Sequence, residues 1–219
     1  MAAPRPSVLA SVARLPIAVG AALALADASV VTLALPEILD RLDTTVEGLA
    51  AVIGVYTVIL AGVVLVAVPA RRWLGSATVG ALGMLLFSVA SVMCGVSDGL
   101  TGLLVSRGAQ AVGAGFGLVA AYELLSRRAG PGDDRRGPGA GEPGDGEPRH
   151  RPAGLWVAAA IFGTAIGPAL GGALTQVFDW RAIFLAQAPF GLLAAAACLV
   201  RQPGSDMDAV AADGDAAVA

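Results

Sequence analysis

The chain has 219 residues, of which 56% are hydrophobic and 14% are charged, with a formal net charge of −3. Its mean hydropathy of +0.75 is that of a membrane protein rather than a soluble enzyme. The sequence contains no phosphate-binding loop, no cluster of cysteine and histidine, and no serine beside a base. It therefore predicts no enzymatic centre, no metal site, no cofactor and no nucleic-acid partner.

Apolar stretches recur along the chain at the length that a bilayer requires. A hydrocarbon core of about 30 Å needs about 20 apolar residues of helix. Backbone polar groups inside lipid must be satisfied within the segment, so each spanning segment is helical. The sequence predicts an all-α polytopic membrane protein, a bundle of six transmembrane helices. We expect the spans at 15–35, 49–68, 79–96, 100–125, 155–177 and 183–200.

The segments outside these spans differ in composition. We expect a cytoplasmic N-terminal segment at 1–14, spans one to four within 15–128, and spans five and six within 154–200. Between them, 129–153 contains twelve Gly or Pro among 25 residues, which favours disorder. We expect a disordered cytoplasmic loop there and a disordered cytoplasmic tail at 201–219.

Arginines are divided unequally between the two sides of the predicted bundle. If the N-terminus is cytoplasmic, eleven arginines fall on inner segments and two on the outer side. Under the positive-inside rule, this bias predicts a multi-pass protein of the cell membrane with both termini in the cytoplasm. The inner arginines are Arg5, Arg14, Arg71, Arg72, Arg127, Arg128, Arg135, Arg136, Arg149, Arg151 and Arg201, and the outer ones are Arg41 and Arg181.

The N-terminus also has features of a cleavable secretory signal. Basic residues precede an apolar core, and A-L-A at 24–26 resembles a small-residue cleavage site. The apolar run continues past that point to Leu35, which favours an uncleaved first span.

Glycines recur at helical spacing in the fifth predicted span. They form the string G-x8-G-x3-G-P-x2-G-G at Gly154, Gly163, Gly167, Pro168, Gly171 and Gly172. Glycines three and four apart lie on one helix face and let another backbone approach closely in lipid, and the proline adds a bend. The string resembles motif C of the major facilitator superfamily, a signature of the fifth span in its antiporter branch.

Other segments resemble the drug:proton antiporters of this superfamily, especially the fourteen-span multidrug efflux type, over about residues 15–200. The segment 27–36 is similar to the family's first-span pattern L-D-x-T-I-V-N-V-A-L-P, and R-G-A-Q at 107–110 resembles motif B. The segment 180–191 resembles W-R-x-I-F-x-x-N-x-P-x-G, with Gln187 where Asn is usual.

The predicted loop between spans two and three departs from the family pattern G-R-L-A-D-R-x-G-R-R. This chain has V-P-A-R-R-W-L-G-S-A at 68–77, in which only Gly75 keeps its family identity. Arg72 replaces the acidic residue that, in the family, pairs with basic groups to latch the cytoplasmic gate. The resemblance therefore does not predict the usual latch here.

Two charged residues fall well inside predicted spans. Asp27 lies near the middle of the first, and Arg107 lies about two turns below the outer end of the fourth. Ionisable groups at such depths face the bundle interior, paired or lining a water-filled cavity. We expect Asp27 to bind a proton or a cationic substrate, and motif B implies that Arg107 and Gln110 belong to a proton relay. The alternative is a structural Asp27–Arg107 ion pair that only joins two helices.

Polar and aromatic residues near the span ends have simpler expected roles. Glu123 stands four residues before Arg127, a spacing that favours an ion pair on the helix surface. Trp73, Trp156 and Trp180 all fall at predicted span ends, where tryptophan is typical of the membrane interface.

The resemblance implies that this bundle is one six-helix half of a transporter. In complete family members, two such halves rock around a midplane site and give alternating access. We expect a half-size, proton-gradient-driven exporter of small amphipathic compounds, which a homodimer or a separate six-span protein completes in the lipid bilayer. Two alternatives are an inactive, truncated remnant and a non-transporting membrane interaction or regulatory protein.

Overall fold

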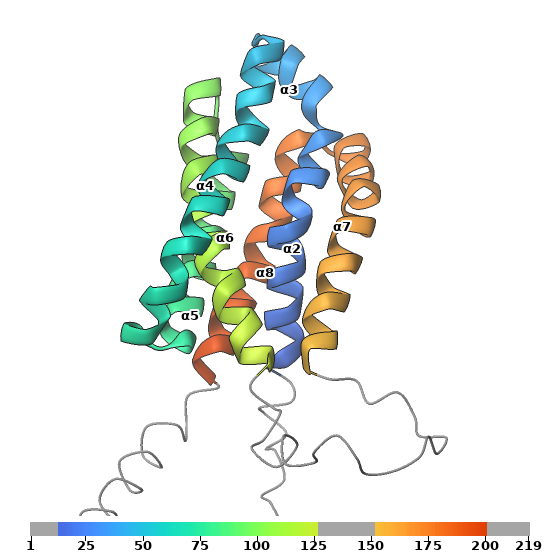
Figure 1. Ribbon diagram of the computed structural model, residues 1–219. Coiled ribbons are helices and arrows are strands. Elements are labelled where there is room, and N and C mark those ends of the chain that lie inside the picture. Colours follow the sequence, from blue (N-terminus) through green and yellow to red (C-terminus); the bar gives the residue numbers. More distant parts are fainter. Residues whose placement is uncertain (1–12, 127–151, 201–219) are drawn as a thin grey trace, which may run out of the picture.

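The computed structural model describes residues 13–126 and 152–200, and all regular structure in these ranges is helical (Figure 1). This confirms the predicted all-α fold. The described helices are α2 (Arg14–Thr32), α3 (Leu35–Arg41), α4 (Val46–Leu74), α5 (Ser76–Gly95), α6 (Leu100–Ser126), α7 (Pro152–Val177) and α8 (Trp180–Val200).

Five of the described helices, α4 to α8, are long and apolar enough to cross a membrane. The chain is therefore a multi-pass membrane protein. The remaining long helix, α2, has 19 residues and a length of about 28 Å, close to the thickness of the hydrocarbon core. It runs beside the other five, and its assignment as the first of six spans remains a prediction.

The connection between α4 and α5 is shorter than predicted. α4 continues through Pro69, Arg71 and Arg72 to Leu74, and Gly75 alone separates it from α5. Gly75 has φ +79°, a conformation that glycine adopts without a steric cost. Arg71 and Arg72 lie in the last turn of α4, where their positive charges interact favourably with the negative end of the helix dipole. This interaction favours the extension of α4 to Leu74. The predicted loop at 68–77 is therefore wrong, because most of that segment is helical.

Other helices also begin earlier than predicted, and α4 begins at Val46 instead of residue 49. α7 begins at Pro152, and proline is well suited to a first helical position, where its missing N–H costs nothing. α8 begins at Trp180 instead of residue 183. Nearly all of the N-terminal segment, the loop expected at 129–153 and the tail at 201–219 lie outside the described residues.

The long helices alternate in direction (Figure 1). The first residues of α2 and α7 and the last residues of α6 and α8 lie at one end of the bundle, the lower end in the view. The turn between α4 and α5 is at that end too. The short helix α3 and the connections that precede α6 and α8 lie at the opposite end. This alternation matches the order of crossings that the arginine distribution requires.

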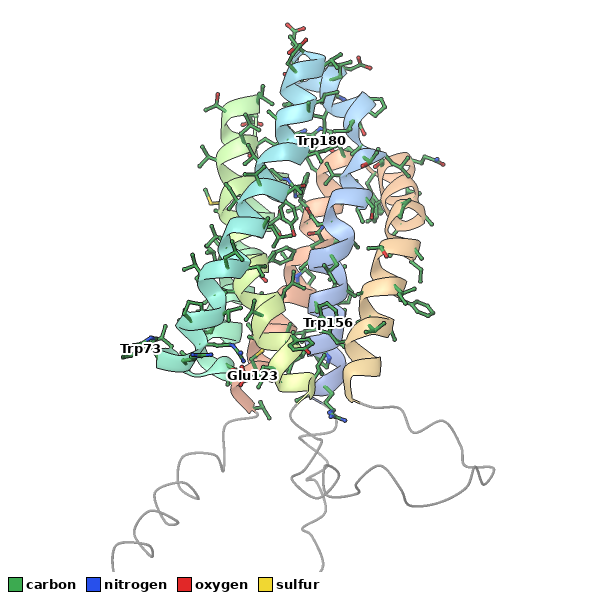
Figure 2. The ribbon with its side chains drawn as sticks, viewed as in Figure 1. Trp73, Glu123, Trp156 and Trp180 are labelled. Atoms are coloured by element: carbon green, nitrogen blue, oxygen red, sulfur yellow. The ribbon has the colours of Figure 1, made fainter. Side chains whose placement is uncertain are left out.

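The helices differ in how much of their surface the bundle covers. α5 packs between α6 and α8, α2 packs against α7, and α4 packs against α6. Of the most apolar part of each helix, 67% is buried in α6, but only 17% in α4 and 11% in α7. Both helices carry exposed large apolar side chains, among them Leu65 of α4 and Phe162 of α7, and side chains project outward from the bundle in Figure 2. Apolar faces of this kind suit lipid or a second bundle.

Candidate functional site: a buried ion pair between α2 and α6

The glycines of α7 pack directly on α2. A Cβ atom built on Gly163 would collide with the carbonyl oxygen of Ala22. One on Gly167 would lie 2.6 Å from the Ser29 hydroxyl, and one on Gly171 would lie 2.5 Å from a backbone oxygen of α2. Only glycine leaves room for the two helices at this separation.

The other residues of the same string are placed differently. A Cβ on Gly172 would lie 3.2 Å from the end of the Leu33 side chain, which is able to move aside. α7 continues without interruption through Pro168 to Val177. Gly154 lies in the first turn of α7, in the part where the structure describes no side-chain surroundings.

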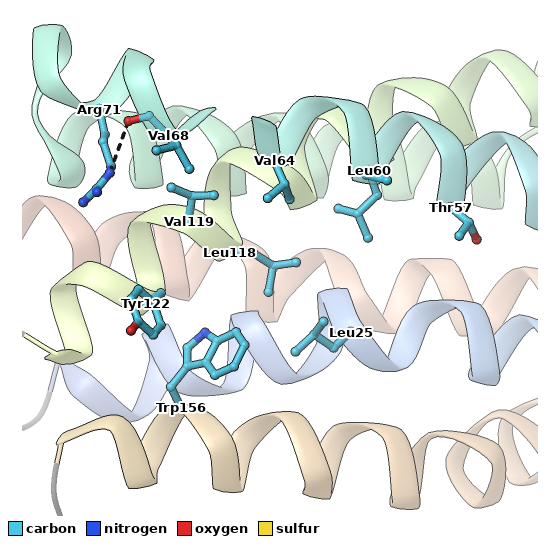
Figure 3. Close-up of a pocket in the computed structure, with 11 residues that line it drawn as sticks. Leu25, Thr57, Leu60, Val64, Val68, Arg71, Leu118, Val119, Tyr122 and Trp156 are labelled. Carbon is cyan, nitrogen blue, oxygen red and sulfur yellow. Dashed lines mark hydrogen bonds between the residues drawn. The ribbon is translucent and has the colours of Figure 1, made fainter. Parts of the chain in front are cut away.

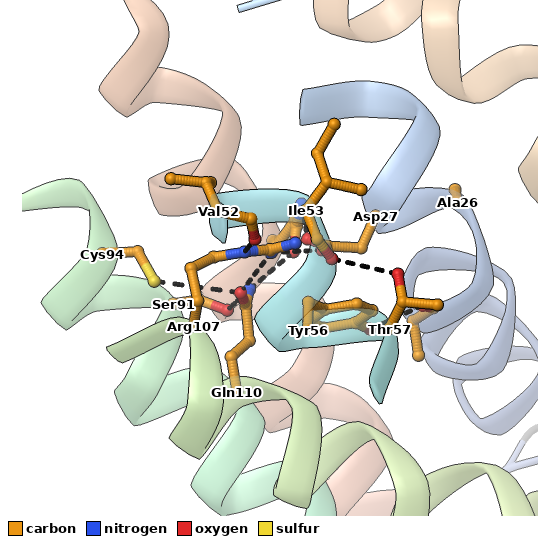
Figure 4. Close-up of polar contacts among 12 residues, drawn as sticks. Ala26, Asp27, Val52, Ile53, Tyr56, Thr57, Ser91, Cys94, Arg107 and Gln110 are labelled. Atoms are coloured by element: carbon orange, nitrogen blue, oxygen red, sulfur yellow. Dashed lines mark hydrogen bonds and ion pairs between the residues drawn. The ribbon is translucent and has the colours of Figure 1, made fainter. Parts of the chain in front are cut away.

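Asp27 and Arg107 form a buried ion pair that joins α2 to α6 (Figure 4). Nη1 of Arg107 donates to Oδ2 of Asp27, and neither side chain has any exposed surface. The second carboxylate oxygen, Oδ1, accepts a hydrogen bond of 3.0 Å from Nε2 of Gln187 on α8. Asp27 is therefore not an isolated carboxylate, because both of its oxygens are engaged.

Gln110 continues the network from this pair. Its side-chain oxygen accepts a 2.7 Å hydrogen bond from Nη1 of Arg107, and its amide donates to the Ser91 hydroxyl at 2.8 Å. The same amide nitrogen lies 3.2 Å from the side-chain oxygen of Gln187. The ring of contacts between Asp27, Arg107, Gln110 and Gln187 thus closes on itself across α2, α6 and α8.

Aromatic rings cover the guanidinium group of Arg107. Its central carbon lies 4.2 Å from the centre of the Tyr56 ring and 5.6 Å from that of Phe184. Tyr56 is held in turn by a 2.7 Å hydrogen bond from its hydroxyl to the Ala24 carbonyl. Cation–π contacts of this kind compensate a desolvated charge. Among the described residues, Nη2 of Arg107 has no hydrogen-bond partner.

The structure thus brings together the three polar residues chosen from the sequence, Asp27, Arg107 and Gln110. α2 links them to the glycine helix, since one side of α2 packs on α7 and another carries Asp27. Sequence analysis had missed Gln187 as a member of the network. The available signal was the amide that the family places at this position.

A second polar cluster lies at the lower end of the bundle in Figure 2. Glu123 of α6 is paired with Nη1 of Arg71 at the end of α4, and it accepts a 2.6 Å hydrogen bond from Ser76 at the start of α5. The expected partner Arg127 lies outside the described residues. Glu123 therefore connects three helices at the α4–α5 turn, beyond the surface role expected for it.

The three tryptophans have three different environments. Trp73 is 89% exposed, as expected for an interfacial residue. Trp156 is partly buried and packs edge-on against Tyr122, with ring centres 5.6 Å apart. Trp180 is fully buried and packs edge-on against Phe184. Trp180 stands at a helix end, as predicted, but it is not part of an exposed interfacial belt, because its side chain is buried in the core.

An apolar cavity of about 580 Å³ lies among α2, α4, α6 and α7 (Figure 3). The two helices that the bundle covers least, α4 and α7, form two of its walls. Its lining residues are Leu25, Thr57, Leu60, Ala61, Val64, Val68, Arg71, Leu118, Val119, Tyr122 and Trp156.

Comparison with known proteins agrees with this architecture. The sequence profile of the Major Facilitator Superfamily matches residues 17–217. The chain belongs to the major facilitator superfamily. It is thus a member of a transporter family rather than an enzyme, and its helices form a bundle like one half of a facilitator.

Several resistance proteins of this superfamily are similar in sequence. The chain is 31% identical over 173 residues to the multidrug resistance protein Stp of Mycobacterium tuberculosis. It is 30% identical over 191 residues to a methylenomycin A resistance protein of Bacillus subtilis, and 28% identical over 177 residues to that of Streptomyces coelicolor. These alignments cover 76%, 86% and 81% of this chain.

The same alignments cover only 28%, 38% and 34% of the relatives' own lengths. The chain thus spans about a third of the length of the curated relatives that it matches.

Proposed function

We propose that this bundle is one half of a proton-coupled exporter of small amphipathic compounds. The observation that carries the proposal is the buried ion pair between Asp27 and Arg107. A pair of opposite charges is costly to keep inside a membrane protein and is usually functional where it occurs. The similarity to multidrug and methylenomycin resistance proteins supports efflux as the direction of transport.

In this proposal Asp27 is the proton acceptor. A proton that binds to Oδ2 neutralises the carboxylate and removes its attraction for Arg107. The guanidinium stays charged, because arginine does not lose its proton in proteins, and Gln110 and the Tyr56 ring then hold it. α2 and α6 lose the ion pair that joins them, so protonation favours a different arrangement of these helices.

A second six-helix bundle completes the exporter. Halves of facilitators are parallel repeats that rock about a midplane site, so two bundles inserted in the same direction can face one another about a twofold axis. The thinly covered helices α4 and α7 and the cavity between them form the face for this partner. A second copy of the chain or another six-span protein fills the role, in the cell membrane, with both termini in the cytoplasm.

Reconstitution into proteoliposomes with an imposed pH gradient tests this function. We expect dye efflux driven by the gradient, an altered pH dependence for Asp27→Asn, and no proton-driven efflux for Arg107→Ala. Gly54→Ala is the matched control, because a Cβ on Gly54 meets nothing within 4 Å. If both network variants insert normally and transport as the wild type does, the ion pair has only a structural role. A folded, inserted wild type without efflux would favour the non-transporting alternatives.

A further inference from the structure

The cavity among α2, α4, α6 and α7 has the size of a small-molecule site. Its volume of about 580 Å³ lies within the range of roughly 300–1,000 Å³ that is usual for ligand pockets. Four helices that are far apart in sequence form its walls, as Figure 3 shows. Leu25 and Leu118 lie on one side, and Leu60 and Val64 of α4 lie opposite them.

The lining is almost entirely aliphatic and aromatic. Tyr122 and Trp156 meet edge-on at one wall, and such rings bind other aromatic rings through stacked or edge-to-face contacts. Among the described residues, Arg71 is the only charged one that lines the cavity. Its Nη1 is engaged by Glu123 and its Nε donates to the Val68 carbonyl at 3.2 Å, which fixes the guanidinium at this end of the cavity.

No carboxylate lines this cavity in the described part of the chain. The long helices there carry three acidic residues. Asp27 has no exposed surface and is paired with Arg107. Glu123 is held by Arg71 and Ser76, and Glu47 belongs to the first turn of α4, at the other end of that helix from Arg71.

We infer that this cavity takes uncharged or anionic aromatic compounds and rejects cations of the same size. A cation that enters an apolar, desolvated site loses its hydration and needs a nearby negative charge. The described lining of this cavity offers none, and the charged group that it does present is the guanidinium of Arg71, whose partner Glu123 lies outside the lining. An anion meets the positive end of the Arg71–Glu123 pair, and an uncharged compound has no charge to desolvate. The inference rests on the proposed function in one respect, since it makes the cavity the site of the exported compound.

The same argument holds after a second bundle has closed the cavity, if the partner is a second copy of this chain. A twofold axis would bring the same lining residues to the other wall, including a second Arg71. The completed site would then present two guanidinium groups, each paired with its own Glu123 outside the lining, and still no carboxylate among the lining residues. Its preference for anions over cations would grow.

Three probes that share one ring system test the charge preference. Naphthalene-2-carboxylate is anionic, naphthalene-2-carboxamide is uncharged, and naphthalen-2-ylmethylammonium is cationic. Their binding to the purified chain in nanodiscs is measured by titration calorimetry, with protein-free nanodiscs as the blank. We expect the anion and the amide to bind at least about tenfold more tightly than the cation, because like charges in an interface are strongly unfavourable. Equal or tighter binding of the cation, or no binding of any probe above the blank, would overturn the inference.

Substitutions in the cavity wall test whether the residues of this cavity cause the charge preference. Leu60→Glu places a carboxylate in the cavity and should invert the order in favour of the cation, whereas Leu60→Gln, with the same shape and no charge, should not. The double variant Arg71→Gln/Glu123→Gln removes both charges of that pair and should cost the anion about tenfold in affinity while sparing the amide. Arg72→Gln, beside it on the exposed surface, is the control. If Leu60→Glu binds the three probes in the same order of affinity as the wild type, the probes bind outside this cavity.

The binding assay separates this inference from the proposed function. If the anion and the amide bind more tightly than the cation but no efflux occurs in proteoliposomes, the cavity inference stands and the transporter proposal fails. If efflux occurs and the cation is the compound exported best, the exporter stands and the charge preference is wrong.

Discussion

Arg107 reaches across the bundle to Asp27, which lies 80 residues earlier in the chain, and neither side chain retains any contact with solvent. Gln110 and Gln187 complete the polar coordination, and Tyr56 covers the guanidinium face. A buried charge pair is weak evidence for stability, because desolvation offsets much of its Coulomb attraction. Removal of either residue alone is costly, because the other charge stays buried and unpaired. Single and double variants therefore test the pair.

The first prediction concerns this pair. Asp27→Asn leaves the guanidinium of Arg107 without its counter-charge, and Arg107→Gln leaves the carboxylate unpaired. Each single substitution should cost about 3–5 kcal/mol in the free energy of unfolding. The double variant should recover most of that loss, because no buried charge remains unpaired. Unfolding in mild detergent checks this, and additive losses in the double variant would show that the two residues are not coupled.

The second prediction concerns Gln187, which donates to Asp27 and accepts from Gln110. Gln187→Leu keeps the size but leaves both partners short of a hydrogen bond, at a cost of about 1–3 kcal/mol. Gln187→Glu instead places a second carboxylate against Asp27. The repulsion exists only when both are ionised, so this variant should lose stability as pH rises. The loss should be absent at low pH. A pH-independent loss would contradict the contact with Asp27.

The third prediction uses two neighbouring glycines of α7. Gly171→Ala places a methyl group 2.5 Å from the backbone oxygen of Val30, which cannot move without shifting α2. Gly172→Ala meets only the flexible end of Leu33 at 3.2 Å. We expect Gly171→Ala to cost about 1–3 kcal/mol through overpacking and Gly172→Ala to cost much less. Thermal unfolding of both variants tests this prediction. Equal losses of stability would contradict this packing of α7 on α2.

The fourth prediction concerns the cluster at the α4–α5 turn. Glu123→Gln removes the charge that holds Arg71 but keeps an oxygen for Ser76. Because the pair is partly exposed, the stability loss should be small, about 0.2–1 kcal/mol. Proteolysis near Gly75 should increase, since the ends of α4 and α6 are then less firmly joined. Arg72→Gln should leave the proteolysis rate unchanged, and an equal increase in both variants would contradict the pairing of Arg71 with Glu123.

Much of the bundle follows from sequence because lipid imposes strong constraints. A run of about 20 apolar residues in a membrane has few alternatives to a helix. The ends of α4 and α8 were less predictable, since Pro69 resembles a boundary residue but lies inside α4, and α8 begins at Trp180, three residues before the predicted span. What extends these helices is tertiary packing, such as the burial of Trp180 against Phe184.

The candidate site was predictable in part. Asp27 and Arg107 stand out because charge is rare inside apolar spans, and their burial follows from its cost. Their pairing with one another depends on the packing of α2 on α6, which a single sequence does not contain. Gln187 is uncharged and lies in a third helix, so its contact with Asp27 became visible only in three dimensions.

Proton exchange on ligand binding tests the central claim most directly, because it reports on Asp27 without requiring transport. Naphthalene-2-carboxamide, which has no titratable group, is added to the purified protein in weakly buffered detergent, and the mass of the assembly is determined in the same sample. We predict an assembly of two six-helix bundles whose wild-type form exchanges protons with the solution when the probe binds, while Asp27→Asn binds the probe without proton exchange. Equal proton exchange by the wild type and by Asp27→Asn would contradict the account.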